Sequence, residues 1–331
     1  MFDKTLPTNA IIAITLNCNS KCTMCDIWKN NIKNELHAKD YLKLPSSLKD
    51  INLTGGEPFL RTDIADIIKN IKSACPNARL IINTNGFLPK SVERQIANII
   101  KIDPNIAIRL SVDGTPKTHN QIRNQKNGFE LLMQTLNILQ KNQVRDLGIS
   151  FTIMEQNYLE LPYIYDFCQK NNLELSLTIA TDSPIYFGKN KTVFRPQNSL
   201  KLKEAIYHIV NSQYKKNNIK ENFRSWFDQK LIEYFETSIR PYPCDAGKDF
   251  FYMDSTGNIF ACHLKNNKIG NIKSDSFKKM WQTQQIKKRC LQNQKCNDCW
   301  MICSSKTNIR KNILPISFQI LKEKTKLWLK K

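Results

Sequence analysis

Short apolar segments alternate with amphipathic segments over residues 10 to about 215. Segments with the length and β-branched composition of strands lie at 11–16, 51–54, 80–84, 106–112, 148–154 and 173–179. Helical patterns fill the gaps between them, for example at 61–74, 89–101, 128–142 and 157–171. Repeated strand–helix units predict a parallel sheet with helices outside it, and the chemistry of such folds collects at the carboxyl ends of the strands.

A change of pattern divides the second half of the chain. A long helical stretch is predicted at about 198–237, and the Pro-bounded break at 240–244 marks a domain boundary. We therefore expect an α/β protein: a partial (βα)6 TIM-like barrel with a small Cys-rich C-terminal domain. The predicted parts are a core at 8–215, a helical linker at 216–243, a Cys-rich domain at 244–303 and a basic tail at 304–331.

The composition is that of a globular protein with a strong excess of positive charge. The 331 residues are 41% apolar and carry a net charge of +21. Binding to nucleic acid or to an anionic membrane would use this charge, but the basic residues are scattered and are not interleaved with aromatic residues. This favours a solvated basic surface and no specific nucleic-acid partner. There is no apolar run of transmembrane length and no secretory signal pattern, so we expect a cytoplasmic protein.

Nine of the eleven cysteines fall into two groups, one near the start and one in the last third of the chain. Without an export signal, such groups indicate metal sites and no disulfide bond in the cell. The remaining two, Cys75 and Cys168, are most simply buried small apolar residues.

The first group follows the first predicted strand with the spacing Cys18-x3-Cys22-x2-Cys25. A zinc site would need a fourth ligand, and His37, twelve residues away, is a poor fit. Three thiolates on a [4Fe–4S] cluster would instead leave one iron open for a small molecule. Polar turns follow the next three predicted strands, at Gly55-Gly56-Glu57, Asn83-Thr84-Asn85-Gly86 and Ser111-Val-Asp113-Gly114.

The cysteine loop followed by these turns closely resembles the radical SAM superfamily over about residues 10–180. The resemblance implies a [4Fe–4S] cluster and S-adenosylmethionine (SAM) as cofactors, and a reductase with flavodoxin or ferredoxin as electron donor. It implies that the reduced cluster cleaves SAM to methionine and a 5′-deoxyadenosyl radical, which takes a hydrogen atom from the substrate.

The resemblance also implies which residues contact SAM. It places Glu57, with Gly55 and Gly56, at the amino group of the methionine moiety, and Arg123 at the carboxylate. The other residues implied are Met24 at the adenine, Asn83 in the turn after the third strand, Ser111 and Asp113 at the ribose or carboxylate, and Asn157 at polar groups of SAM. Ordinary alternatives are a helix-start carboxylate for Glu57, a surface salt bridge for Arg123 and loop packing for Met24. No catalytic side chain can be named.

The second cysteine group resembles the C-terminal extension called SPASM, or its shorter Twitch form. The first half, Cys244-x12-Gly257-x4-Cys262, matches well, whereas the second half, Cys296-x2-Cys299-x3-Cys303, is compressed and no cysteine follows it. We therefore expect one auxiliary [4Fe–4S] cluster. Its expected ligands are Cys244, Cys262, Cys296 and either Cys299 or Cys303, with Cys290 spare. A structural zinc ion is the alternative.

The substrate class stays open between a ribosomally made peptide and a small molecule such as a sugar. The cysteine loop starts at residue 18, which leaves no room upstream for a fused leader-peptide-binding domain and favours a small molecule or carbohydrate. A non-catalytic iron–sulfur scaffold or electron carrier is a further hypothesis. The three-cysteine loop together with the Gly-Gly-Glu turn argues against it, because a carrier needs no SAM pocket.

The basic tail has two interpretations. An amphipathic helix containing Ile316, Phe318 and Trp328 would make peripheral contact with an anionic membrane, whereas a terminal helix would dock on the barrel. The apolar stripe is interrupted at 322–326, which favours docking.

Overall fold

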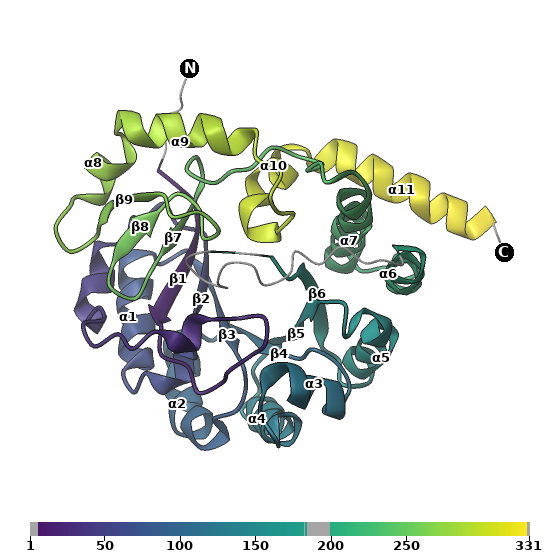
Figure 1. The fold of residues 1–331 in the computed structure, drawn as a ribbon, viewed down its shortest axis with the longest axis horizontal. Coiled ribbons are helices and arrows are strands. Elements are labelled where there is room, and N and C mark those ends of the chain that lie inside the picture. The colour runs from purple at the N-terminus through teal and green to yellow at the C-terminus, as the bar shows by residue number, and fades with distance from the viewer. Residues whose placement is uncertain (1–5, 182, 184–198, 330–331) are drawn as a thin grey trace.

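Six parallel strands form the core of the protein in the computed structural model, which describes residues 6–181, 183 and 199–329 (Figure 1). Each strand pairs with the next one along the chain. They are β1 (Asn9–Thr15), β2 (Asp50–Gly55), β3 (Arg79–Thr84), β4 (Ala107–Ser111), β5 (Asp146–Ile153) and β6 (Glu174–Ile179). The helices that connect them are α1 (Ile64–Ala74), α2 (Pro89–Ile102), α3 (Pro116–Arg123), α4 (Gly128–Lys141) and α5 (Leu161–Lys170). The predicted partial barrel is confirmed.

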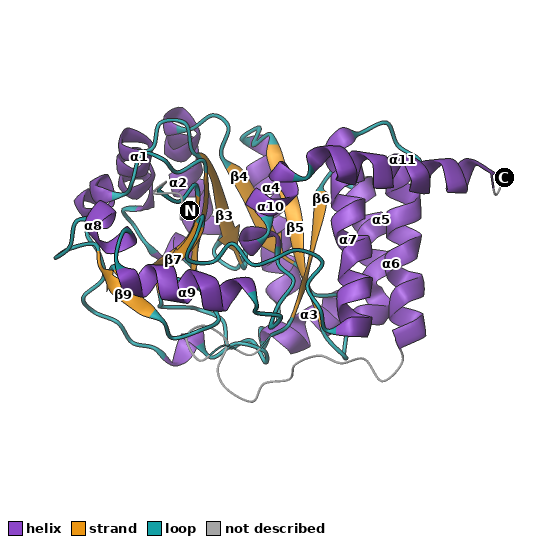
Figure 2. Cartoon of the chain, turned by 90° about the horizontal axis from the view of Figure 1, so that it is seen from above, coloured by secondary structure: helices purple, strands orange, loops and turns teal. Residues whose placement is uncertain are grey.

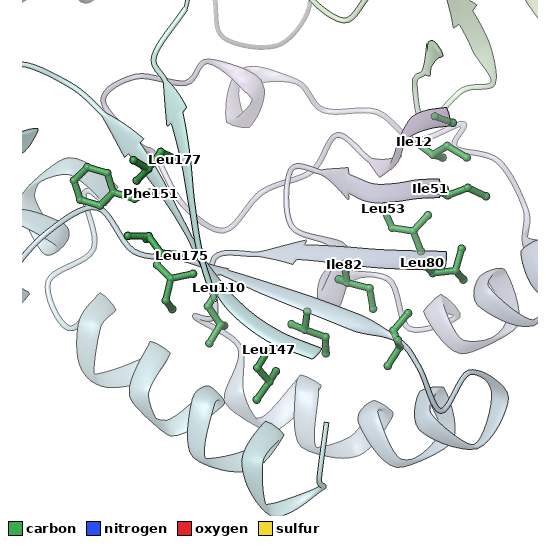
Figure 3. Close-up of a cluster of buried hydrophobic side chains, with 14 of the residues drawn as sticks. Ile12, Ile51, Leu53, Leu80, Ile82, Leu110, Leu147, Phe151, Leu175 and Leu177 are labelled. Atoms are coloured by element: carbon green, nitrogen blue, oxygen red, sulfur yellow. The ribbon is translucent and has the colours of Figure 1, made fainter. Parts of the chain in front are cut away.

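The two faces of the barrel strands differ in polarity. The outward face is apolar and packs under the helices, as Figure 3 shows for residues such as Leu53, Ile82 and Leu110. The inward face is polar and only partly buried, for example at Thr54, Asn83 and Ser111. Parallel strands covered on both faces are usually apolar on both. The alternation seen here therefore leaves the barrel a polar interior.

The Cys-rich region continues the same sheet. Strand β7 (Phe250–Met253) pairs with β1 in parallel, and β8 (Asn258–Phe260) and β9 (Lys268–Asn271) follow in antiparallel order. The hairpin expected at 250–262 is β7–β8, and Gly257 takes the left-handed conformation in its turn (φ +88°). The region also contains α8 (Phe277–Trp281) and α9 (Gln284–Gln294). It is therefore built onto the edge of the barrel sheet, and the predicted domain boundaries stay predictions.

A network of charged residues closes the end of the barrel at which the strands begin. Asp50 of β2 forms ion pairs with Lys306 (2.8 Å) and Arg310 (2.5 Å) of α10 (Lys306–Lys311). Arg109 of β4 pairs with Asp146 and Glu174 at 2.7 and 2.6 Å. The two ion pairs of Asp50 hold the segment after the last cysteine against the start of β2. The carboxyl ends of the strands lie at the other end.

The helical stretch predicted at 198–237 forms two helices, α6 (Ser199–Tyr214) and α7 (Ile219–Thr237). Helix α6 packs against both α5 and α7 (Figure 2). A last helix, α11 (Ile313–Leu329), packs on α6 and α7. Parts of the predicted core and tail lie outside the described residues. They are residues 182 and 184–198 of the core and 330–331 of the tail, and residues 1–5 at the start of the chain are also outside. Among the helices of the described ranges, none has the length and apolar character to cross a membrane.

We predict that a buried carboxylate on α7 makes stability pH-dependent. Burial raises the pKa of Asp228 from 3.8 to about 7, while nearby Arg224 opposes the rise. The folded state therefore binds the Asp228 proton more tightly than the unfolded state does. The protonated carboxyl stabilises the fold at low pH, and this stabilisation is lost as the pH rises to about 7 and above. Asp228→Asn should raise the free energy of unfolding at neutral pH by up to on the order of 4 kcal/mol, with little effect near pH 4.

Denaturant unfolding of the chain between about pH 5 and about pH 8 would measure this difference. The exposed carboxylate of Asp166 on α5 offers a matched control, and Asp166→Asn should change nothing. A gain for Asp228→Asn that did not depend on pH would contradict the prediction.

Candidate active site and auxiliary cluster site

The first cysteine group lies at the carboxyl ends of the strands, on the loop that follows β1. Cys18, Cys22 and Cys25 line a cavity of about 170 Å³. The residues from the other strand ends that share it include Thr54, Gly55, Gly56, Asn83, Ser111, Arg123, Thr152, Thr178 and Thr181. The structure thus brings together the cysteine loop and the three polar turns that the sequence singled out.

The three thiols influence one another's ionisation. Burial raises the pKa of Cys18 to about 12, and Cys22 and Cys25 add to this rise. Burial likewise raises the pKa of Cys25 to about 11. Metal ligation requires thiolates, so loading this site must release protons.

The thiolates of Cys18, Cys22 and Cys25 are ligands of a kind that either a single metal ion or an iron–sulfur cluster uses. Within the described ranges, no three His, Cys, Asp or Glu side chains are grouped as a single metal ion requires. In a [4Fe–4S] cluster, cysteines ligate the cube through separate irons and surround it. Three cysteines beside a cavity fit that arrangement.

The Gly-Gly turn after β2 holds the cysteine loop by direct backbone contact. Gly56 N donates to Thr15 O (2.8 Å), and Glu57 N donates to Asn17 O (2.9 Å). A Cβ atom on Gly55 would lie 1.9 Å from Thr15 O, and one on Gly56 would lie 2.0 Å from Asn17 O. Only glycine permits this approach, and the contact fixes the position of Asn17, the residue just before Cys18.

The Glu57 carboxylate is buried beneath the cavity and is not among the residues that line it. It accepts hydrogen bonds from Phe59 N (3.0 Å), Thr84 Oγ1 (2.7 Å) and Asn85 N (2.7 Å). Burial raises its pKa to about 6, although these bonds oppose the rise. The carboxylate therefore orders the turn after β3. Its assignment to the SAM amine stays a prediction, whereas the glycines beside it do face the cavity.

Arg123 is buried at the cavity wall and connects the cysteine loop to β4. Its Nη2 lies 2.6 Å from Asp113 Oδ2, and its Nη1 lies 3.7 Å from Cys22 Sγ. Burial would lower its pKa, but Asp113 and Cys22 together raise it above the ordinary value. Two buried polar atoms of the lining, Arg123 Nε and Thr181 Oγ1, have no hydrogen-bond partner within the described ranges. Such atoms fit a polar ligand, and a charged Arg123 fits the carboxylate of SAM.

Met24, Asn83 and Ser111 also line the cavity, in agreement with the SAM contacts implied by the resemblance. Met24 packs against an apolar cluster of Ile122, Met154 and Ala180, which fits the flat face of an adenine.

Asp113 and Asn157 lie behind the cavity wall and not in it. Asp113 accepts from Thr152 N (2.9 Å) besides pairing with Arg123. The Asn157 amide accepts from Met154 N and donates to Asp113 O and Thr152 O. Both side chains therefore hold the strand ends in position, and direct contact with SAM stays a prediction for them.

Sequence reasoning missed Thr152, Thr178 and Thr181 as cavity residues. The first two belong to inward-facing rows of polar residues on β5 and β6. The alternation in residues 148–154 and 173–179 could have identified them, because every second residue of a strand shares a face. Thr181 follows β6, and no sequence pattern points to it.

The second cysteine group lies at the base of β7 and β8. Cys244, Cys262 and Cys299 share a buried apolar cluster with Phe250 and Leu264, and Cys303 packs against it. Cys296 is partly exposed but close enough to influence the pKa values of Cys244 and Cys299. Cys290 is buried on α9, outside this cluster. The ligand set, including the choice between Cys299 and Cys303, stays a prediction.

Hydrogen bonds to sulfur support a cluster at this second group. Ala246 N donates to Cys244 Sγ (3.4 Å), Leu264 N donates to Cys262 Sγ (3.3 Å), and Arg240 Nη1 donates to Cys299 Sγ (3.4 Å). Donors of this kind stabilise cluster-bound thiolates and tune the reduction potential.

Sequence comparison defines the class of protein. Residues 12–168 match the radical SAM superfamily, and residues 244–300 match the iron–sulfur cluster-binding domain SPASM. The chain therefore carries a radical SAM domain followed by a SPASM-type C-terminal domain. These domains imply SAM, its [4Fe–4S] cluster and an auxiliary [4Fe–4S] cluster, which confirms the cofactors expected from the sequence.

Individual relatives are distant. The sporulation killing factor maturation protein SkfB of Bacillus subtilis is 24% identical over 83% of this chain and 65% of its own length. The AdoMet-dependent heme synthase of Methanosarcina barkeri is 22% identical over 82% of this chain and 81% of its own length. The match with SkfB covers 65% of the length of that protein, which is slightly less than two thirds. Among solved structures, anSMEcpe with bound AdoMet superposes over 97% of this chain and all of its own, with 16% identity and a TM-score of 0.65.

We predict about eight irons per chain after reconstitution, from two [4Fe–4S] clusters. Replacing Cys18, Cys22 and Cys25 together by Ala should halve the iron, and Cys244→Ala with Cys262→Ala should remove the other half. Cys75→Ala, which alters a cysteine outside both groups, should leave iron unchanged. Iron and zinc analysis would check this. About four irons with one zinc would show a structural second site, and about twelve would show a miscounted ligand set.

We predict that Arg123 binds SAM through its charge. Arg123→Gln alone would leave the Asp113 carboxylate buried and unpaired, so the change is best made together with Asp113→Asn. The double variant should keep its iron but bind SAM at least about tenfold more weakly, whereas Asp113→Asn alone, which keeps the charge of Arg123, should weaken SAM binding less. Equilibrium dialysis with reconstituted protein would measure both. Equal weakening in the two variants would refute a direct contact.

Proposed function

We propose that this enzyme reductively cleaves SAM and uses the resulting radical to take a hydrogen atom from a substrate in the barrel. The observation that carries the proposal is the cavity shared by Cys18, Cys22, Cys25 and the charged Arg123. When bound, the cluster and SAM supply one electron and a 5′-deoxyadenosyl radical.

The residues of the chain position SAM and the substrate. Arg123 holds the methionine carboxylate, and the methionine amine lies against Gly55 and Gly56, which line the same cavity. Met24 covers the adenine. The polar inward faces of β5 and β6 continue from this cavity into the barrel and offer hydrogen bonds to a substrate. An auxiliary cluster held by the second cysteine group would supply an electron acceptor or an anchor for the substrate.

We further propose that the substrate is a peptide. SkfB is named for maturing a sporulation killing factor, and its similarity extends over most of this chain. A solved structure of anSMEcpe contains AdoMet and the Cp18Cys peptide, although at 16% identity that likeness supports the fold alone. This proposal departs from the sequence-based preference for a small molecule or carbohydrate. An assay with a peptide and a carbohydrate panel would separate the two by which class stimulates formation of 5′-deoxyadenosine.

We propose an acidic flavodoxin or ferredoxin of the cytoplasm as electron donor. Lys21 and Lys29 lie 5.5 and 5.6 Å from the ring of Trp28, and Trp28 Nε1 donates to Cys25 O (2.8 Å). A positive surface next to a cluster ligand favours an acidic partner. Within the described residues, no disulfide bond joins any of the cysteines, as suits a reducing compartment. Donor-driven turnover that did not fall with rising salt would argue against this surface.

We predict that the reconstituted protein, reduced with dithionite, converts SAM to 5′-deoxyadenosine and methionine. Cys22→Ala should abolish this conversion and spare the iron at the second site, because only the first site loses a ligand. Chromatography of the products, with iron analysis of the same samples, would test both. Fully iron-loaded protein that gave no 5′-deoxyadenosine with any substrate candidate would favour a scaffold or an electron carrier.

A further inference from the structure

Helix α11 exposes a row of large apolar side chains. Leu314, Phe318, Leu321 and Trp328 are 71, 72, 60 and 73% exposed. At 100° per residue, the four lie within an arc of about 80° around the helix. Thr325 interrupts the row between Leu321 and Trp328. Exposed leucines that are scattered singly need no explanation, but four large apolar side chains on one face of a helix mark an interaction surface.

The orientation of α11 is fixed by a second apolar side, so the exposed row is not free to turn inward. Ile316 and Ile320 are buried in the main core, and Leu327 packs against it. Trp226 Nε1 donates to Gln319 Oε1 (2.8 Å), and Lys324 Nζ donates to Lys216 O (3.0 Å). The sequence-based expectation of a docked helix thus describes one side of α11. The other side faces away from the protein, and the end of the helix projects past α6 (Figure 2).

Positive charge accompanies the exposed row. The basic residues of α10 and α11 are Lys306, Arg310, Lys311, Lys322, Lys324 and Lys326, against a single acid, Glu323. Lys306 and Arg310 are paired with Asp50, and Lys326 is paired with Glu323, whereas Lys322 borders the row and is exposed. A helix with Leu, Phe and Trp on one side and lysines beside them is typical of binding in the plane of an anionic membrane.

We propose that the outer face of α11, formed by Leu314, Phe318, Leu321 and Trp328, binds an anionic lipid surface and holds the enzyme at a membrane. A second copy of the chain is a poorer occupant, because two chains of net charge +21 repel each other. A bilayer also needs no matching groove, and the outer face is a single projecting helix. The proposal does not depend on the proposed catalytic function.

Vesicle co-sedimentation with the full, reconstituted chain tests this proposal. We expect binding to vesicles of phosphatidylglycerol and phosphatidylcholine, weak binding to phosphatidylcholine alone, and loss of binding at high salt. Phe318→Ser with Trp328→Ser should lower the partition coefficient at least about tenfold. Lys322→Gln with Lys326→Gln should weaken binding to anionic vesicles only.

Matched controls lie elsewhere on the surface. Leu200→Ser on α6 removes an equally exposed leucine (66%), and Lys278→Gln with Lys279→Gln on α8 removes two exposed charges. Neither should alter vesicle binding. Cleavage of SAM with dithionite should be the same in every variant and the parent. The SAM cleavage assay therefore reports a failure of catalysis, and vesicle co-sedimentation reports a failure of membrane binding.

Three results would overturn the proposal. The first is no binding of the parent protein to anionic vesicles, which would leave an acidic protein as the partner. The second is equal loss of binding in the Leu200→Ser control. The third is self-association of the parent in light scattering that Phe318→Ser with Trp328→Ser abolishes, because the outer face would then join two copies.

Discussion

The close backbone contact between the Gly55-Gly56 turn and the residues just before Cys18 is the constraint on which the active site depends. Two hydrogen bonds, to Thr15 O and Asn17 O, join the end of β2 to the start of the cysteine loop. A side chain at either glycine would separate them. Because Glu57 in the same turn also binds Thr84 and Asn85, one short segment sets the relative positions of three strand ends.

Arg123 extends this arrangement to the fourth and fifth strands. It lies between the Asp113 carboxylate and the Cys22 thiol, and Ser20 Oγ donates to its backbone carbonyl. Asp113 in turn accepts from Thr152 N. A buried cation is stable here because it is paired, and it keeps an unpartnered Nε for an incoming carboxylate. The same residue therefore stabilises the loop and remains available to a ligand.

Much of this could be predicted from the sequence, because strand patterns and the cysteine spacing are local signals. The six strands and the cysteine loop followed from them. The resemblance to the radical SAM superfamily pointed to Met24, Asn83 and Ser111, which line the cavity. Local signals could not show that Glu57 and Asn157 turn away from the cavity, because hydrogen bonds to distant segments decide that. They also could not separate the two sides of α11, since docking on α6 and α7 depends on tertiary packing. The pairing of β7 with β1 is a long-range contact of the same kind.

That pairing has a functional consequence. Strand β1 carries the Cys18–Cys25 loop at its carboxyl end, and its amino-terminal half pairs with β7, beside which Cys244 and Cys262 lie. Seven residues of strand set the two ends of β1 about 20 Å apart. The polar inward faces of the barrel strands occupy the space between these ends. A substrate that reached both sites would therefore lie along the barrel interior, with its reactive hydrogen toward the cysteine loop and its remainder toward the second cysteine group. A compact molecule would contact only one end of a strand of that length, so contact with both cysteine groups requires an extended one.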